Sequence, residues 1–213
     1  MLKYLVKHVK DPLQPQWDAA ETAHINNYPW GGEYRPEARA QVLYSADTLF
    51  VKLRAVEETD CMRAEFEGIN PEAYKDSCLE FFIMPLPEAD PRYINLEFTP
   101  KGALYIGIGK NRHEHEFLGD TDWKVFSIDS YREETKDREA IQKSEWGITA
   151  QIPLAFMREF FDIQAFLPGM HMRGNFYKCG DLTLKPHYGA WNSIDCVTPD
   201  FHKPEFFGEL IFI

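Results

Sequence analysis

Hydrophobic and polar residues alternate with a period of two along most of the chain. The clearest case lies between residues 49 and 56, where Leu49, Val51 and Leu53 fall on one face of an extended segment. Residues 41–44 precede this segment across a short polar turn, so the two segments predict a β-hairpin. The same period predicts further strands at residues 78–84, 93–98, 103–108, 123–128, 145–152, 172–178 and 207–213.

Helical periodicity is confined to one short segment. Pro153 suits the first turn of a helix, and large apolar residues follow it between positions 154 and 161. The stretch 131–143 is highly charged and is interpreted as an exposed connection. Roughly nine to eleven short strands and one short helix predict an all-β fold, an antiparallel two-sheet β-sandwich of the immunoglobulin or jelly-roll kind. Less than about a fifth of the residues should be helical.

Length and charge narrow the class of protein. The 213 residues, 44% of them hydrophobic, fit one globular domain over residues 1–213. The net charge of −11 removes the attraction to phosphates, so nucleic acid is not expected as a partner. No apolar stretch is long enough to span a bilayer, so membrane insertion is not expected either. Lys3, Lys7 and Lys10 interrupt the start of the chain, which has no signal peptide; the protein is expected to be cytoplasmic, or exported with its signal trimmed.

The four cysteines are far apart in the sequence. They are Cys61, Cys78, Cys179 and Cys196, and none belongs to a CxxC pair. The zinc-ribbon and thioredoxin signatures are therefore missing, and the spacing disfavours a metal site built on cysteine. A chain of this length does not need disulfides for stability, so buried free thiols are expected.

The sequence lacks the signature motifs of several enzyme classes, so the remaining candidates for catalytic or metal-binding residues are carboxylates and histidines. There is no dinucleotide loop, P-loop, HExxH or GxSxG motif. Asp76, Glu80 and Glu97 lie on or beside neighbouring predicted strands and keep a glycoside hydrolase open, since such enzymes use two carboxyl groups. His113 and His115 share one side if their segment is extended and could bind a metal, although a solvated loop is the favoured interpretation.

A polar and aromatic stripe runs along residues 171–178. Alternation places Arg173, Asn175 and Tyr177 on one face. Sugars are bound by aromatic rings packed against CH faces and by hydrogen bonds to hydroxyls, and this stripe supplies both; a solvated strand face is the alternative. Trp191 lies in a Gly- and Pro-rich loop, where an exposed tryptophan usually contacts a ligand.

Four segments together resemble the family 9 carbohydrate-binding modules. They are residues 74–83, 93–102, 146–154 and 201–210, and the last, with the pattern FHxPExFGxL, is the most specific. The resemblance spans residues 17–212. It implies a two-sheet sandwich related to the DOMON superfamily that binds carbohydrate without catalysis.

The resemblance also implies a ligand site. In characterised xylan- and cellulose-binding members, two facing aromatic rings clasp the sugar. Carried over to this chain, Trp191 is one ring and Tyr74 the other, although those members have tryptophan near the position of Tyr74. Together with the stripe and the acidic pair, the candidate ligand-binding residues are Trp191, Tyr74, Asp76, Glu80, Arg173, Asn175 and Tyr177.

The expected setting is bacterial glycan degradation, with a carbohydrate as ligand and a glycoside hydrolase as a possible partner. No cofactor is required, and a structural calcium ion is expected from the resemblance without an assigned site. His202, Pro204 and Phe207 in the closing motif are interpreted as structural. Two other classes stay open, a glycoside hydrolase with a carboxylate pair and a DOMON-like haem- or metal-binding module.

Overall fold

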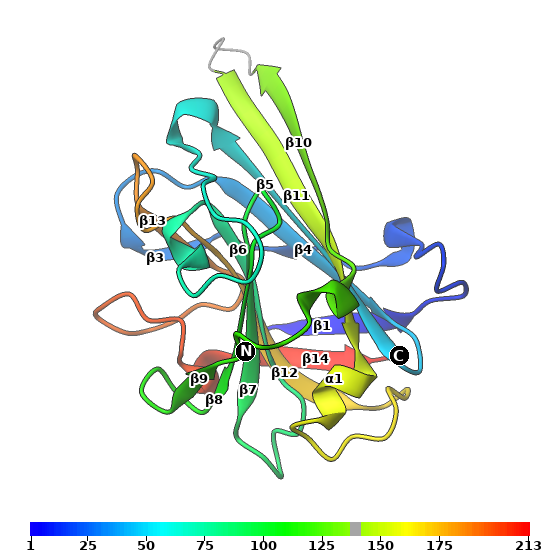
Figure 1. Cartoon of the computed structure of the whole chain (residues 1–213). Helices are drawn as coiled ribbons and strands as arrows, with labels where there is room; N and C mark the ends of the chain where they lie inside the picture. The colour runs from blue at the N-terminus through cyan, green and yellow to red at the C-terminus, as the bar shows by residue number, and fades with distance from the viewer. Residues whose placement is uncertain (137–141) are drawn as a thin grey trace.

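The computed structural model describes residues 1–136 and 142–213, which form mainly β-strands (Figure 1). The strands are β1 (Lys3–His8), β2 (Ala23–His24), β3 (Asn27–Gly31), β4 (Glu37–Tyr44), β5 (Thr48–Glu58), β6 (Cys78–Met84), β7 (Tyr93–Phe98), β8 (Leu104–Gly109), β9 (His115–Phe117), β10 (Asp129–Lys136), β11 (Gln142–Pro153), β12 (His171–Cys179), β13 (His187–Ala190) and β14 (Gly208–Phe212). The helix α1 spans Leu154–Arg158, and the short 3-10 helices are η1 (Trp17–Ala19), η2 (Thr59–Cys61), η3 (Ala73–Lys75), η4 (Trp123–Phe126) and η5 (Pro204–Phe206).

The strands form one curled, mixed sheet. Its order is β10-β11-β5-β4-β1-β14-β12-β6-β7-β8-β9, with β13 paired to β12, β3 to β13 and β2 to β4. The first part of β1 pairs with β14 and its last two residues pair with β4, both in parallel. The expectation of purely antiparallel pairing was wrong, because the N-terminal strand joins the two halves of the sheet through parallel pairs. The all-β class is confirmed, and the curled sheet is consistent with a β-sandwich.

The core lies between the two halves and follows from the alternation of side chains. On β6, Leu79, Phe81 and Ile83 are fully buried, and they share one apolar cluster with Val51 and Leu53 of β5. Burying such side chains contributes about 1.5–3 kcal/mol each. The side chains on the opposite face of β6, which include Glu80, point away from this cluster.

A buried ion pair connects the two halves. Lys178 Nζ of β12 lies 3.1 Å from Glu57 Oε1 of β5, and both side chains are fully buried. Trp146 Nε1 donates to the same carboxylate at 2.7 Å, and Ser77 Oγ donates to its other oxygen at 3.0 Å. Burial lowers the pKa of His187 to about 3, and the positive charge of Lys178 contributes to this shift. The His187 ring is therefore neutral and accepts a hydrogen bond from Lys178 Nζ at 2.9 Å. Both charges are thus hydrogen-bonded, which such a buried pair needs in order not to destabilise the fold.

Two expected elements differ from the structure. Residues 131–143 do not form an exposed connection, since β10 and the start of β11 pair there and run side by side to the top of Figure 1; residues 137–141 lie outside the described part. Because β10 pairs with β11 alone, its charged side chains protect a sheet edge from further pairing. Residues 123–128 contain η4 in place of a strand, and Asp122 caps it by accepting from the backbone N–H of Lys124.

The expected helix is confirmed in α1. It begins directly after Pro153 and buries Leu154, Phe156 and Met157 against the core. The described residues hold one short α-helix and a few 3-10 turns, which confirms the low helical content. No helix in the described ranges has the length and hydropathy to cross a membrane.

Replacing Lys178 by methionine should strongly destabilise the protein. Lys178→Met leaves the Glu57 carboxylate buried without its cation, and we expect a loss of about 3–5 kcal/mol in the free energy of unfolding, measured by urea denaturation. Lys3→Met breaks the exposed pair with Glu209 and should cost less than about 1 kcal/mol. Similar losses for the two variants would contradict the role given to the buried pair.

Candidate functional site

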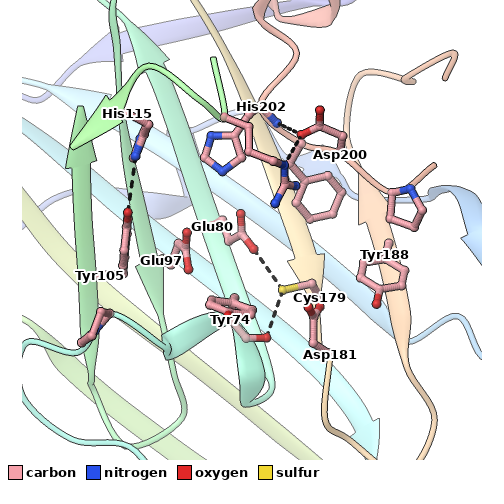
Figure 2. A pocket seen from close by; sticks show the side chains of 14 residues that line it. Tyr74, Glu80, Glu97, Tyr105, His115, Cys179, Asp181, Tyr188, Asp200 and His202 are labelled. Atoms are coloured by element: carbon pink, nitrogen blue, oxygen red, sulfur yellow. Dashed lines mark hydrogen bonds and ion pairs between the residues drawn. The ribbon is translucent and has the colours of Figure 1, made fainter. Parts of the chain in front are cut away.

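A cavity of about 480 Å³ opens on the outer face of the half formed by β12, β6, β7 and β8 (Figure 2). Its wall and floor consist of Pro71, Tyr74, Glu80, Glu97, Tyr105, Arg112, His115, Cys179, Asp181, Tyr188, Pro199, Asp200, Phe201 and His202. Its volume falls within the range of about 300–1,000 Å³ that is typical of small-ligand sites. It is the candidate functional site.

Two neighbouring rows across the sheet underlie the cavity, and all their members except Cys78 and Tyr177 line it. The first row consists of Cys78, Cys179 and Tyr188, and the second of Tyr177, Glu80, Glu97 and Tyr105. All of these point away from the core because the residues between them along each strand point into it. One residue of β8 makes room above the floor: a Cβ added to Gly107 would lie 2.0 Å from the ring of His115.

Three tyrosines surround the floor. Tyr74 comes from η3 and is 37% exposed, Tyr105 comes from β8 and Tyr188 from β13. Figure 2 shows Tyr105 and Tyr188 on opposite sides of the cavity, with Tyr74 beside Glu80. The cavity therefore offers aromatic rings around a polar floor.

Two carboxyl groups stand next to each other on this floor. Burial raises the pKa of Glu80 to about 7, although the Sγ–H of Cys179, which donates to Glu80 at 3.0 Å, opposes the rise. Burial and the nearby charge of Glu80 raise the pKa of Glu97 well above its usual range. Glu97 Oε1 accepts from Asn95 Nδ2 at 2.9 Å, while its buried Oε2 has no hydrogen-bond partner among the described residues. The floor thus has hydrogen-bonding capacity that the protein itself leaves unused.

The histidines of the wall are neutral. Burial lowers the pKa of His115 to about 4 and that of His202 to about 3, and the charge of Arg112 acts in the same direction. His115 Nε2 lies 2.6 Å from Asn95 Oδ1, and His202 Nδ1 lies 2.7 Å from Tyr93 Oη. The Asn95 amide nitrogen donates to Glu97, so the Asn95 oxygen accepts a hydrogen bond from the neutral His115 ring. This hydrogen bond orients the amide.

An ion pair links two loops of the wall. Arg112 Nε lies 3.0 Å from Asp200 Oδ1, which also accepts from the backbone N–H of His202 at 3.0 Å. The pair connects the loop between β8 and β9 with the segment that carries Phe201. It therefore holds together parts of the wall that are far apart in the sequence.

Of the predicted site residues, Tyr74 and Glu80 line the cavity. Asp76 does not: it is fully buried, forms an ion pair with Arg63, and accepts from the backbone N–H groups of Glu65 and Phe66 at 2.7 and 2.9 Å. A carboxylate with all these partners orders its own loop and is not free for a ligand.

The predicted stripe on β12 is also structural. The Arg173 guanidinium donates to the backbone oxygens of Glu205 and Phe207. Asn175 is fully buried, and its side chain hydrogen-bonds both the N–H and the carbonyl of Asn192. The remaining member, Tyr177, lies in a floor row but is covered by a stacked ring, Phe201, at 4.1 Å. The stripe therefore anchors the closing loops, and its expected role as a ligand surface is corrected.

Trp191 is a core residue, which corrects the expectation of an exposed loop position. It is 5% exposed and packs against Tyr4 and Phe176, with ring centroids at 6.3 and 5.6 Å. Alternation along the end of β13 turns Tyr188 to the cavity and Trp191 to the core. An added Cβ at Gly208 would lie 2.4 Å from the Trp191 ring, so the glycine of the closing motif makes room for it.

Some residues of the closing motif have structural roles, and others line the cavity. Phe207 is fully buried, and Pro204 begins η5, which fits structural roles for both. His202, however, lies in the cavity wall. Glu97, which the sequence suggested only as a catalytic carboxylate, lines the cavity beside Glu80. The sequence analysis missed Arg112, Asp181, Tyr188, Asp200 and Phe201, because loops bring most of them together, whereas alternation on β8 was a signal that could have added Tyr105.

Within the described residues, one group of potential metal ligands comes together, consisting of Cys78, Glu80 and Cys179. Calcium takes six to eight oxygen ligands, so two thiols and one carboxyl do not fit it. The structural calcium ion stays a prediction without a site. The four cysteines are free thiols, as expected, and three of them are buried.

The fold and the cavity define a β-sandwich-like module with a polar, tyrosine-lined cavity. Comparison with known families gives the class: residues 12–212 match carbohydrate-binding family 9. The chain therefore belongs to that family.

Individual relatives come from fungi and bacteria. The chain is 26% identical over 186 residues to an "Extracellular protein" of Arthroderma benhamiae, covering 84% of this chain and 79% of that one. It is similar to the crystal structure of a "putative carbohydrate-binding protein" of Bacteroides uniformis, with a TM-score of 0.79, 26% identity and 99% of each chain covered. A family 9 module of Caldicellulosiruptor kristjanssonii in complex with cellotriose has a TM-score of 0.61 and 10% identity over 99% of this chain and 93% of that one, which shows a shared fold.

The core position of Trp191 predicts a large loss of stability on truncation. Trp191→Ala leaves a void between Tyr4 and Phe176, and we expect the free energy of unfolding to fall by about 3–5 kcal/mol in chemical denaturation. Tyr74→Ala, at a half-exposed position, should cost far less. A Trp191→Ala protein as stable as wild type would place the ring outside the core.

The raised pKa of Glu80 predicts that stability falls as pH rises. Because the folded-state pKa is about 7 against an ordinary 4.5, the stabilisation is complete below about pH 4.5 and is lost as pH rises through about 7. Thermal unfolding from about pH 5 to 8 should show a falling melting temperature, and Glu80→Gln, which stays neutral, should flatten this slope. Glu116→Gln, at an exposed position, is the control. An unchanged slope in Glu80→Gln would show that Glu80 is ionised throughout.

Proposed function

We propose that the cavity binds a short segment of a neutral glycan without cleaving it. The observation that carries the proposal is the ring of Tyr74, Tyr105 and Tyr188 around a floor of carboxyl groups. Aromatic rings pack against the CH faces of sugars, and the carboxyl groups of Glu80 and Glu97 can donate to and accept from sugar hydroxyls. Membership of carbohydrate-binding family 9 supports the proposal.

The charge of the cavity favours a neutral sugar over an acidic one. Glu80, Glu97 and Asp181 line the cavity, and its one cation, Arg112, is already paired with Asp200. A uronic acid would bring an ionised carboxylate into this site, where burial already raises the pKa of Glu80 and Glu97 and thus disfavours an ionised carboxyl group. Neutral glucans and xylans are therefore the first ligands to test, and the relative solved with cellotriose supports their choice.

Binding fits the arrangement of the carboxyl groups better than hydrolysis does. A glycoside hydrolase places its two carboxyl groups on either side of the bond to be cleaved. Glu80 and Glu97 instead occupy adjacent register positions on one floor. The proposal includes a role in glycan breakdown, in which a separate glycoside hydrolase would carry out the cleavage.

A haem-binding role is less well supported by the contacts. The rings of His115 and His202 both reach the cavity, 5.0 Å apart. However, both nitrogens of His115 face hydrogen-bond partners, Asn95 and Tyr105, and His202 Nδ1 faces Tyr93. These hydrogen bonds hold the two histidine rings in place in the cavity wall. They leave few histidine nitrogen atoms free to coordinate a haem iron.

Tyr74→Ala should weaken glycan binding by about tenfold or more, because a stacking ring commonly contributes about 1–2 kcal/mol or more. A glycan array with neutral and acidic glycans would identify a ligand, and calorimetry would then compare the variants. Tyr188→Ala should show a similar loss. Tyr131→Ala, which removes a half-buried tyrosine from β10 on the other half of the sheet, is the matched control.

Two outcomes would contradict the proposal. One is a wild-type protein that binds no glycan on the array, and the other is a loss in Tyr131→Ala equal to that in Tyr74→Ala. Release of sugar from the identified ligand would replace the binding role with a hydrolytic one. Visible absorbance in the purified protein would support the haem alternative in its place.

A further inference from the structure

Two cysteines separated by about half of the sequence meet under the cavity. Cys78 on β6 and Cys179 on β12 lie directly opposite each other in the antiparallel ladder, and Glu80 follows Cys78 on the same face. The two sulfur atoms and one carboxylate oxygen all lie within 4.8 Å of one another, and the three side chains are buried. Two strands of a hydrogen-bonded sheet hold them, so the group is positioned before any ligand arrives.

The chemistry of this group suits a thiophilic divalent cation. Thiolates select zinc over calcium and magnesium, which prefer oxygen ligands alone. Zinc sites with three protein ligands keep a fourth position for water or another ligand. Cys179 and Glu80 line the cavity, so a fourth ligand could reach such an ion from the cavity.

We propose that Cys78, Cys179 and Glu80 bind a zinc ion at the floor of the cavity. On binding, the two thiols and the Glu80 carboxyl release their protons to solvent, and the sulfurs and the carboxylate coordinate the metal. Glu80 belongs to both the metal site and the proposed glycan site, but the zinc proposal does not rest on glycan binding, because its test uses the metal alone.

The electrostatic surroundings support a cation at this place. Glu97, next to Glu80 in the ladder, has a buried carboxyl oxygen with no hydrogen-bond partner among the described residues. Asp181 also lines the cavity, and the cationic side chain in the described lining, Arg112, pairs with Asp200. A divalent ion would offset this excess of acidic groups and would favour the ionised form of each.

Cobalt serves as the spectroscopic probe for the site. The full chain, reduced and freed of metal by a chelator, is titrated with Co²⁺ without oxygen. We expect a sulfur-to-cobalt charge-transfer band that saturates at one equivalent and disappears when zinc displaces the cobalt, since zinc thiolate sites bind zinc more tightly. Elemental analysis of the zinc-loaded protein should give one ion per chain.

Variants test the three ligands separately. Cys78→Ser should abolish the band and weaken zinc binding by about a hundredfold or more. Glu80→Gln keeps both thiols and the side-chain volume, so the band should persist while the affinity falls by about tenfold or more. Cys61→Ser is the matched control, because Cys61 is also buried beside a carboxylate, Glu58, at 3.6 Å, but lies outside the group. Circular dichroism verifies the fold of each variant.

Three results would overturn the proposal. The first is a reduced, folded wild-type protein without a one-equivalent cobalt band. The second is a band that survives in folded Cys78→Ser or is lost in Cys61→Ser. The third is a thiol count that shows a Cys78–Cys179 disulfide in the protein as isolated, combined with the absence of cobalt binding after reduction.

Discussion

The buried ion pair between Lys178 and Glu57 is the interaction on which the other features depend. It joins β12 of one half of the sheet to β5 of the other, and both charged side chains are buried. Because side chains alternate along a strand, fixing Lys178 toward the core fixes its neighbour Cys179 toward the outer face. Strand β12 therefore provides both the ion pair that connects the two halves and part of the cavity floor. The position of Cys179 in the floor follows from the inward position of Lys178 in the ion pair.

The cavity combines two kinds of surface. Its floor is acidic and desolvated, which favours protonated carboxyl groups, and its sides are tyrosine rings and neutral histidines. A floor of this kind can hydrogen-bond an uncharged polyol or coordinate a cation, and Glu80 belongs to both arrangements. The two proposals thus meet at one residue, and a metal at the floor would change the charge that a sugar encounters.

Much of the fold could be predicted from the chain, and less of the site. The long alternating segments that became β5, β6, β7 and β11 and the helix after Pro153 were evident, because period and breaker residues are local signals. The charged strand β10 was missed, since an edge strand needs only one partner and can have polar residues on both faces. The parallel pairing of β1 with β14 and β4 was missed because pairing between the two ends of a chain leaves no local pattern.

The sequence by itself determined which side chains share a face of each strand, and hence that Glu80 points away from the residues that form the core. Only the tertiary structure decided which strands lie next to each other, and so that Cys78 meets Cys179 and Glu80 meets Glu97. It also decided what the two sides of the segment around β13 meet, namely the cavity at Tyr188 and the core at Trp191, where Gly208 leaves space for the ring. The physical reason is that alternation is a property of one strand, whereas neighbours across a sheet and the room for a ring depend on contacts between distant parts of the chain.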